Sequence, residues 1–449
     1  FSFHPHPRPS LNFAPACLWQ GLIPPTMLEL SFIREHREEA EQRLAKRNID
    51  VKALLDRTAE LDELRRRTQV DLDARLAELN ELSRSIGELM KAGNKAEAET
   101  ARSRTADLKA TAASLKEQLE GTEKSLHDHL CTIPNAPNAR VPVGKTPEEN
   151  TVVMHEGALP DLPADAKPHW ELGEQYGFLH MDLGVKVTGA GFPVYSGPGA
   201  KLQRALISFF LDRATEAGYR EFIPPHMVNA ASAFATGQLP DKEGQMYHAT
   251  ADDLYLIPTA EVPITNLYRD VILDPEQLPV KMVGYTPCFR REAGSYGAHV
   301  RGLNRVHQFD KVEIVRLEHP DHSYAALEDM VEHVKGLLRA LELPYRQLLL
   351  CGGDMGFSSA LTYDMEVYAG AQKRWLEVSS ISCFETFQSN RLKLRFRDGK
   401  RTRLPHTLNG SALALARIVA AILENNQTPE GIRIPTALRP YTGFDMIRP

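Results

Sequence analysis

A long proline-free segment constrains the fold of this chain more than any other feature. From about residue 50 to residue 130 the sequence is rich in Ala, Glu, Leu, Lys and Arg, and it contains no proline. These residue types lose little side-chain freedom in a helix, whereas proline would remove a backbone donor and break it. The segment is therefore predicted to form long helices.

Positions that are mostly apolar recur in this segment at alternating steps of four and three, in two sets. The first set is Leu72, Leu76, Leu79, Ser83, Ile86 and Met90, and the second is Ala101, Thr105, Leu108, Ala112, Leu115, Leu119, Thr122 and Leu126. Residues 91–95 lie between the sets and include Gly93 and Asn94, which favour a helix end. We expect an antiparallel coiled-coil arm, which at about 1.5 Å per residue would reach about 57 Å over about 38 residues. A coiled coil that joins two chains is the alternative from the spacing alone.

Length and composition bound the class of protein. A chain of 449 residues exceeds one ordinary core and suggests two or three domains. Apolar residues make up 42% and charged residues 25%, and no run of about 18 apolar residues could span a bilayer. The net charge of -6 argues against nucleic-acid binding through overall charge, so any RNA contact must be local. The five cysteines are widely spaced and form no CxxC pair, which favours a reducing, cytoplasmic setting over a zinc site.

Both ends of the helical segment are marked in the sequence. Residues 1–26 are rich in Pro and His and contain one charged residue, so we expect them to lie outside the fold, as upstream sequence or a transit-peptide remnant. After residue 130, the residues that mark a linker are Pro134, Pro137, Pro142, Gly144 and Pro147. The remainder mixes short alternating strands with helices, which predicts an antiparallel α+β enzyme domain. It contains neither a Walker motif nor a strand-turn-helix GxGxxG.

The segment with the most informative chemistry is a predicted hairpin. Residues 288–292 and 304–315 read as strands around a basic, glycine-containing loop at 293–303. Alternation would place Arg290 and Glu292 on one face of the first strand, and Lys311 and Glu313 on one face of the second. Guanidinium groups beside carboxylates suit a zwitterion lying next to a nucleotide. A salt-bridged exposed hairpin is the alternative reading.

At about residues 285–315, this hairpin resembles motif 2 of the class II aminoacyl-tRNA synthetases, and its sequence resembles that of the seryl-tRNA synthetases in particular. Residues 191–225 resemble motif 1, in which a helix over 200–216 and the following strand make a homodimer interface. Residues 406–424 resemble motif 3, read here as a small-residue turn that opens an Ala- and Leu-rich helix with Arg417. The resemblance covers roughly residues 27–441 and implies an antiparallel-sheet catalytic domain at 136–449, preceded by a tRNA-binding arm at 27–135.

The resemblance also implies roles for individual residues. Arg290 and Arg417 would be catalytic, neutralising charge on ATP and on the carboxylate of serine. The serine-binding residues would be Thr259, Ala260, Glu261, Arg290, Glu313, Asn409 and Ser411. Glu313 would read the serine hydroxyl with help from Ser411, and the segment containing Thr259 and Glu261, read as extended, would hold the amino group. The ATP-binding residues would be Arg290, Arg291, Glu292, Val306, Glu377, Val378, Ser379, Ser380 and Arg417.

The implied metal is Mg²⁺ bound together with ATP, with Glu377 and Ser380 as hard oxygen ligands. These residues are three apart, so a regular strand would turn them to opposite faces, and joint binding requires a bulge or a strand end. An exposed strand bearing Ser and Glu is the alternative. Departures from the family pattern are Arg291, His299 and residues 381–390, and they bear on tRNA or loop contacts.

The implied function is serine-tRNA ligase. Serine and ATP would give seryl-adenylate, and serine would then pass to tRNA(Ser) and also to tRNA(Sec). Near the arm tip, the candidates for phosphate contacts are Lys91, Lys95, Arg102 and Arg104, although solvated surface charges are the alternative. Two further functions stay open from the residues: a paralogue that loads a carrier protein, and a non-catalytic RNA-binding coiled-coil scaffold.

Overall fold

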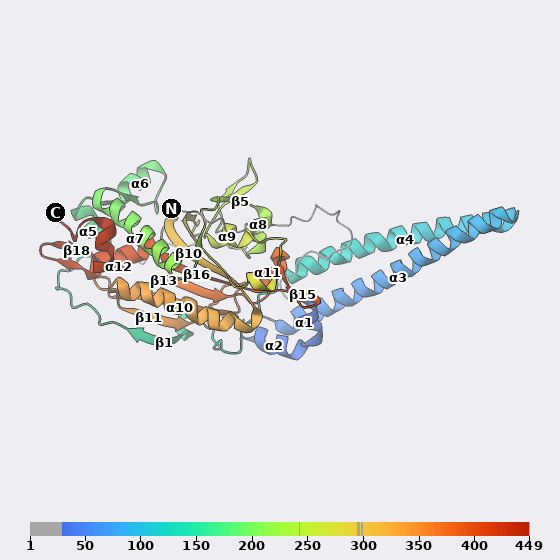
Figure 1. Ribbon diagram of the computed structural model, residues 1–449, viewed down its shortest axis with the longest axis horizontal. Coiled ribbons are helices and arrows are strands. Elements are labelled where there is room, and N and C mark those ends of the chain that lie inside the picture. Colours follow the sequence, from blue (N-terminus) through green and yellow to red (C-terminus); the bar gives the residue numbers. More distant parts are fainter. Residues whose placement is uncertain (1–28, 242, 294–296, 298–299, 449) are drawn as a thin grey trace, which may run out of the picture.

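A two-helix arm projects from a body built on a β-sheet (Figure 1). The computed structural model describes residues 29–241, 243–293, 297 and 300–448. Residues 1–26, for which the sequence predicted a position outside the fold, fall outside these described ranges. The same is true of His299, one of the departures noted in the hairpin loop.

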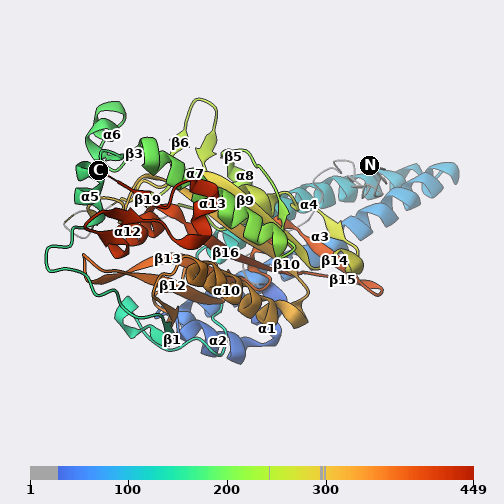
Figure 2. The same cartoon turned by 60° about the vertical axis from the view of Figure 1, so that its left-hand side comes forward.

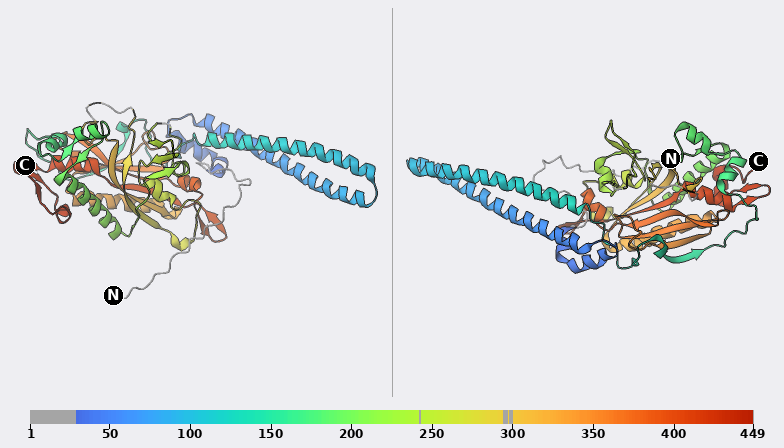
Figure 3. Two further views of the ribbon diagram at one scale, coloured as in Figure 1. Left: turned by 90° about the horizontal axis from the view of Figure 1, so that it is seen from above. Right: turned by 180° about the vertical axis from the view of Figure 1, so that it is seen from behind.

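The arm consists of α3 (Val51–Lys91) and α4 (Lys95–Leu130), which run side by side in opposite directions (Figure 3). The carboxylate of Asp50 accepts the Ala53 N–H at 3.1 Å and so caps the first turn of α3. At about 1.5 Å per residue, the 41 residues of α3 extend for about 60 Å. Gly93 has φ 83° in the turn, a conformation that glycine adopts without steric penalty. The helical hairpin predicted from composition and spacing is present.

The seam of the arm follows the prediction in α4 but differs in α3. In α4, Leu108, Ala112 and Leu119 are buried against α3. In α3, Leu72 and Leu79 are buried, but the residue that packs with them is Leu82. The predicted seam residues Leu76, Ser83 and Met90 are exposed, Leu76 by 44% and Met90 by 45%. Positions 72 and 79 lie on two possible stripes along the surface of α3. One stripe passes through positions 76 and 83 and the other through positions 75 and 82. Helix α4 packs against the second stripe.

Two short helices close the root of the arm against the body. They are α1 (Leu30–Glu35) and α2 (Arg37–Ala45). Their apolar side chains share a core with both long helices and with the chain that follows α4, composed of Ile33, Ala40, Leu44, Leu55, Leu61, Leu126, Leu130, Ile133 and Ala136. The root is thus a small helical unit with its own core.

The body contains an eight-stranded sheet among the described residues, in the order β1-β11-β12-β13-β16-β10-β9-β4. Neighbouring strands are antiparallel except β4 and β9, which are parallel. The strands are β1 (Thr151–Glu156), β4 (Arg220–Glu221), β9 (Val280–Phe289), β10 (Gln308–Glu318), β11 (Tyr345–Leu349), β12 (Leu361–Ala369), β13 (Arg374–Cys383) and β16 (His406–Ala414). The antiparallel α+β architecture agrees with the prediction.

Three long helices cover one face of this sheet: α7 (Gly197–Glu216), α10 (Ser323–Ala340) and α12 (Leu415–Asn425) (Figures 1 and 2). Ile314 and Ala412 belong to the core that these helices form with the strands. Because side chains alternate along a strand, Glu313 and Ser411 project from the opposite face. That face borders α9 (Glu261–Asn266), and this is where polar side chains gather.

The remaining elements form small sheets and short helices around the body. The short strands are β2 (Leu179–His180), β3 (Val194–Tyr195), β5 (Met227–Asn229), β6 (His248–Ala249), β7 (Leu254–Leu256), β8 (Ile272–Leu273), β14 (Arg395–Asp398), β15 (Arg401–Arg403), β17 (Gln427–Thr428), β18 (Gly431–Arg433) and β19 (Met446–Ile447). The short helices are α5 (His169–Gln175), α6 (Met181–Val187), α8 (Ala230–Ala235), α11 (Phe387–Leu392) and α13 (Arg439–Thr442). Within the described ranges, no helix combines the length and the apolar character needed to cross a membrane.

Candidate active site

A cavity of about 680 Å³ opens on the sheet face opposite the three long helices. Strands β10, β13 and β16 form its floor, and the chain that follows β9 forms one wall. The predicted site residues that line it are Thr259, Glu261, Arg290, Glu292, Val306, Glu313, Glu377, Val378, Ser379, Ser380, Asn409, Ser411 and Arg417. Segments spread over about 160 residues of sequence therefore converge on one pocket.

Two predicted site residues do not line this cavity. Ala260 is fully buried in the apolar cluster behind it, packed with Ile264. Arg291 is exposed, and its backbone N–H donates to the Gln245 carbonyl at 2.9 Å. The resemblance assigned Ala260 to the serine-binding loop and Arg291 to the nucleotide-contact region. Neighbours in sequence point to different sides, which explains both differences.

The floor of the cavity contains a fully buried carboxylate, Glu313. Its Oε2 lies 2.5 Å from Nζ of Lys311 and accepts the Ser411 hydroxyl at 3.3 Å. Its Oε1 accepts from the Asn409 amide at 3.1 Å. The predicted sharing of a face by Lys311 and Glu313 is thus observed. An ionised carboxylate offers about four lone-pair sites, so Glu313 can still accept one further donor from a ligand.

A second buried carboxylate, Glu261, lies beside the first. The amide of Gln388 donates to Glu261 Oε1 at 2.7 Å, and the amide of Asn409 donates to Oε2 at 2.8 Å. Burial, followed by repulsion from Glu313, raises the pKa of Glu261 to about 7, although the bonds from Gln388 and Asn409 and the charge of Lys311 oppose the shift. Asn409 bridges the two carboxylates. A cationic ligand group placed here would offset their repulsion.

Thr259 and Glu261 reach the cavity in a way that differs from the predicted extended segment. Strand β7 ends at Leu256, and Glu261 begins helix α9. The Glu261 N–H donates to the Thr259 hydroxyl at 3.2 Å, which ties the two residues at the start of the helix. The prediction was wrong about the strand because the pattern of apolar and polar residues continues through Pro258 into the helix.

The basic wall of the cavity contains Arg290, which directly follows β9. Its guanidinium lies over the ring of Phe309, with 5.3 Å between Cζ and the ring centroid, and its Nε donates to the Pro258 carbonyl at 3.4 Å. The predicted strand extended to residue 292, but β9 ends at Phe289, and Glu292 has φ 49°. Glu292 therefore does not share a strand face with Arg290; it pairs with Arg305 at 2.8 Å instead.

Arg417 lies in the first turn of α12, on the opposite side of the pocket. Its Nε donates to the Asn304 carbonyl at 2.9 Å and its Nη1 to the Glu377 carbonyl at 2.7 Å. The side chain is 28% exposed, and Nη1 lies 3.5 Å from the carboxylate of Glu377. The guanidinium is thus fixed by backbone oxygens and remains open to the cavity.

A buried polar network supports the loop that precedes Asn304. The ring of His169 contacts Glu424 through Nδ1 at 2.8 Å and accepts the Leu303 N–H through Nε2 at 2.8 Å. Since Nε2 accepts, Nδ1 carries the hydrogen and donates it in a hydrogen bond to the Glu424 carboxylate. Gln372 donates to Glu424 at 2.8 Å and accepts from the Asn304 amide at 2.7 Å. The exit from the hairpin loop is therefore fixed next to Arg417.

A bulge in β13 brings Glu377 and Ser380 to the same cavity. Met365 pairs with Ser379, whereas the next residue of β12, Glu366, pairs with Glu377, so Val378 is the extra residue. This is the irregularity that joint contact with a ligand would require. Two oxygen side chains fit a Mg²⁺ ion whose other ligands would be phosphate oxygens and water. Among the described residues, no group of three or more His, Cys, Asp or Glu side chains is arranged to hold a metal ion by itself.

The segment predicted as a small-residue turn before α12 is instead a strand, β16 (His406–Ala414). It lies between β13 and β10, with Asn409 opposite Ser382 on one side and Ser411 opposite Glu313 on the other. The small residues serve a different purpose from a turn: a Cβ on Gly410 would lie 3.2 Å from Ile381. They let the strand pass close to its neighbours.

Several residues that line the cavity were not predicted as site residues, and they are Gln238, Glu243, Gln245, Asn304, Arg305, Phe309, Lys311, Ser358, Ser359, Ser382 and Phe384. Alternation had placed Lys311 on the face of Glu313 without a role in the site, and Phe309 could have been found because it lies on the same side of β10. Ser358, Ser359 and Phe384 come from turns and strand ends, where no sequence period indicates direction.

This antiparallel sheet, with the motif 2 and motif 3 segments around one polar pocket, is the core of a class II aminoacyl-tRNA synthetase. The family model for the tRNA synthetase class II core domain (G, H, P, S and T) matches residues 246–426. The model for the seryl-tRNA synthetase N-terminal domain matches residues 27–137, which include the arm.

Relatives that match almost the whole chain show which family of class II synthetases it belongs to. A serine-tRNA ligase of Salinibacter ruber is 49% identical over 424 residues, covering 94% of this chain and 99% of the relative. One of Cyanothece sp. is 46% identical over 429 residues, covering 94% and 100%. A crystal structure of seryl-tRNA synthetase from Pyrococcus horikoshii complexed with ATP superposes with a TM-score of 0.89 at 33% identity, covering 94% of this chain and 100% of the other. The chain belongs to the seryl-tRNA synthetase family.

Proposed function

We propose that the cavity activates serine with ATP to form seryl-adenylate and that the chain then transfers serine to tRNA. The observation that supports this most directly is the pair of buried carboxylates, Glu261 and Glu313, on a floor flanked by Arg290 and Arg417. Acidic groups at one end suit an ammonium and a hydroxyl. Guanidinium groups at the other suit a carboxylate and phosphates.

At the acidic end, Glu313 accepts the serine hydroxyl, with Ser411 and Asn409 holding the carboxylate in place. Thr259 and Glu261 hold the ammonium group. Alanine would leave the buried Glu313 acceptor without its partner, at a cost of about 1–3 kcal/mol. The selection between serine and alanine therefore follows from one unsatisfied acceptor.

At the basic end, Arg290 and Arg417 hold the α-phosphate and the reacting carboxylate in line. The carboxylate oxygen of serine attacks the α-phosphorus, the bond to pyrophosphate breaks, and no side-chain nucleophile takes part. Positioning and charge neutralisation carry the step. Glu377 and Ser380 would hold Mg²⁺ with the ATP phosphates, and that ion supplies further neutralisation of phosphate charge. Glu292, Val306, Val378 and Ser379 complete the nucleotide wall.

The arm binds tRNA, and the reach of α3 beyond the body supports this part of the proposal. Lys91, Lys95, Arg102 and Arg104 are placed near its tip, where they can contact phosphates. Arg102 and Arg104 pair with Glu99 and Glu78, so RNA would have to replace those carboxylates. Both tRNA(Ser) and tRNA(Sec) are proposed substrates, because the pocket binds the same amino acid, serine, in either case.

One assay in two stages tests the function. Serine-dependent exchange of pyrophosphate into ATP should occur with the chain alone, and purified tRNA(Ser) or tRNA(Sec) should then accept labelled serine. Absence of exchange would contradict the proposal and leave an RNA-binding scaffold. Exchange without transfer to either tRNA would favour a paralogue that loads a carrier protein, although the arm argues against it.

A homodimer is proposed for the working enzyme. Ile223, which follows edge strand β4, is 88% exposed, and Val187 of α6 is 78% exposed. Apolar side chains as exposed as these suit burial against a second copy of the chain. Sedimentation should show twice the mass of one chain for the protein and a single chain for the Ile223→Asp variant. A monomeric wild-type protein would contradict it.

A cytoplasmic location is proposed because the reaction consumes ATP and tRNA, which occur together there. Fluorescence of a tagged full-length chain in its native cell would test this, and confinement to an organelle would contradict it.

A further inference from the structure

The root of the arm is bonded directly to the wall of the cavity. Arg47 follows α2, is 9% exposed, and donates to three backbone carbonyls. Its Nε bonds to the Asn135 carbonyl at 3.1 Å, its Nη1 to Met355 at 2.8 Å and its Nη2 to Ser359 at 2.5 Å. Burial lowers the pKa of Arg47 to about 10, which leaves the guanidinium charged at neutral pH. A fork of fixed donors thus joins the backbone at Asn135 to the segment that contains Met355 and Ser359.

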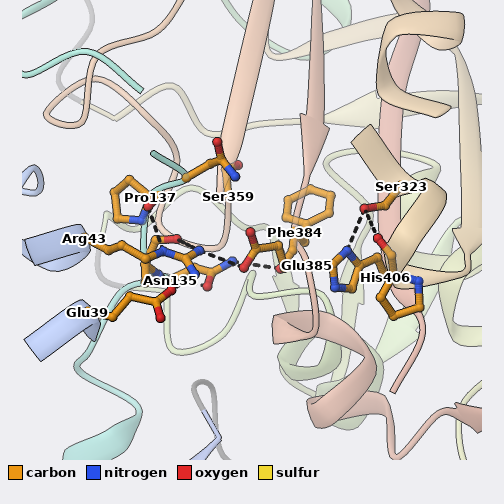
Figure 4. Close-up of polar contacts among 12 residues, drawn as sticks. Glu39, Arg43, Asn135, Pro137, Ser323, Ser359, Phe384, Glu385 and His406 are labelled. Atoms are coloured by element: carbon orange, nitrogen blue, oxygen red, sulfur yellow. Dashed lines mark hydrogen bonds and ion pairs between the residues drawn. The ribbon is translucent and has the colours of Figure 1, made fainter. Parts of the chain in front are cut away.

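Asn135, which is 2% exposed, continues this connection. Its amide donates to the Ser358 carbonyl at 2.9 Å and to the Phe384 carbonyl at 2.8 Å. Its backbone N–H donates to the Phe357 carbonyl at 2.9 Å. Figure 4 shows Asn135 beside Phe384 and Ser359, with Arg43 reaching from the root to Glu385 at 2.7 Å.

The segments held in this way belong to the cavity. Ser358, Ser359 and Phe384 all line it. Phe384 directly follows β13, and its N–H donates to the Thr407 carbonyl at 2.9 Å on the strand that contains Asn409. This places it at the end of the pocket with the buried carboxylates, away from Arg417 and Glu377.

We propose that Arg47 and Asn135 are positioning residues for amino-acid selection, holding the Ser358–Ser359 backbone and Phe384 so that the acidic end of the pocket has the right shape. This inference rests on the function proposed above. Neither side chain lines the cavity, so both act only through the backbone that they fix. Loss of the connection widens the serine end and leaves the nucleotide end unchanged.

The test compares Arg47→Lys and Asn135→Asp with the unmodified full chain in serine-dependent pyrophosphate exchange. A lysine cannot span three carbonyls, and an aspartate replaces two donated bonds with repulsion between oxygens. The serine KM should rise by about tenfold or more while the ATP KM stays within about twofold. Thermal unfolding and binding of labelled tRNA report whether the fold and the arm are intact.

Lys46 offers a matched control at the same root. Its Nζ donates to the carbonyls of Asn138, Ala139 and Val141, none of which lines the cavity. Lys46→Met should alter unfolding temperature but neither KM. A rise in serine KM with this control equal to that with Arg47→Lys would overturn the proposal.

Other outcomes are equally decisive. The proposal for Arg47 and Asn135 would be overturned by an unchanged serine KM in a folded variant, or by equal rises in the KM for serine and for ATP. If Arg47→Lys does not fold, Asn135→Asp decides on the same two constants, and failure of both to fold would make the connection a folding requirement and refute the specific role. Absence of exchange in the unmodified chain would instead refute the proposed function.

Discussion

At the scale of single residues, the pocket is defined by two carboxylates in different surroundings. Glu313 has a cation at 2.5 Å, whereas Glu261 has only neutral amide donors and the neighbouring negative charge. Burial and the neighbouring Glu313 therefore favour the neutral form of Glu261 below its pKa of about 7. A polar substrate with one hydroxyl and one ammonium matches this asymmetry.

Glu313→Gln should raise the serine KM in pyrophosphate exchange by about tenfold or more and leave the ATP KM within about twofold. The amide weakens acceptance of the hydroxyl, and it also leaves the buried Lys311 without its partner, which lowers the unfolding free energy by about 3 kcal/mol. The double variant Lys311→Met, Glu313→Gln is the control. It should recover part of the stability, measured by urea unfolding, but none of the serine affinity. Equal effects on the KM for serine and for ATP would contradict the assignment.

Serine binding should release a proton from Glu261 at about pH 6. The free protein holds this carboxyl protonated below its pKa of about 7, and the ammonium of serine stabilises the charged form. Titration calorimetry in two buffers of different ionisation enthalpy measures the release, and affinity should rise as the pH increases toward 7. Glu261→Gln should show weaker binding and no release from this site. The same release in that variant would exclude Glu261 as its source.

Glu261 should also reduce stability as pH rises. Its folded pKa of about 7 lies above the ordinary value of 4.5, so between these values the folded chain binds more protons than the unfolded chain. The unfolding free energy of the protein without serine, measured relative to Glu261→Gln, should therefore fall across this range and level off above it. A relative stability that increases over the same range would contradict the raised pKa.

At the scale of elements, the sequence predicted which segments form helices or strands better than it predicted where those elements end and which way their side chains point. The arm, the second hairpin strand and α12 could be recognised from period and composition. The first strand of the hairpin was misplaced because alternation continues through residues such as Arg290 after the backbone has left the sheet. Likewise, β16 was read as a turn, since glycine and serine are typical of turns and only the neighbouring strands explain them here. The pocket residues on turns, such as Ser358, have no periodic signal at all.

The arm seam gives a direct test at this scale. Leu82→Ala should destabilise the middle of the arm by about 1–2 kcal/mol, because Leu82 packs against the buried seam, whereas Leu76→Ala should change it by less than about 0.5 kcal/mol. Hydrogen exchange of amides in α3 and α4 measures the local effect in the full chain. A larger effect from Leu76 would restore the seam predicted from sequence.

At the scale of the whole molecule, the chain separates recognition of a small metabolite from contact with a large one. The pocket lies within the body, on a rigid sheet, and the arm extends about 60 Å for its longer helix. The core of the root and the bonds from Arg47 and Asn135 connect the two. Chemistry on serine and ATP should thus depend on the root of the arm but not on its distal part.

Shortening the arm should therefore separate the two half-reactions. Replacement of residues 73–113 by a short glycine-containing turn keeps the root core and joins α3 to α4 where the seam residues Leu72 and Leu115 lie. Pyrophosphate exchange should stay within about twofold of the full chain, while the transfer of serine to tRNA(Ser) falls by about a hundredfold or more, because the phosphate contacts of the distal arm are lost.

A variant that keeps the full arm but replaces Lys91 and Lys95 by Gln is the companion; it should retain exchange and show a smaller loss of transfer with weaker salt dependence. Equal transfer by the shortened and full chains would show that the arm is not needed for tRNA, and loss of exchange in the shortened chain would show that the distal arm supports the pocket itself.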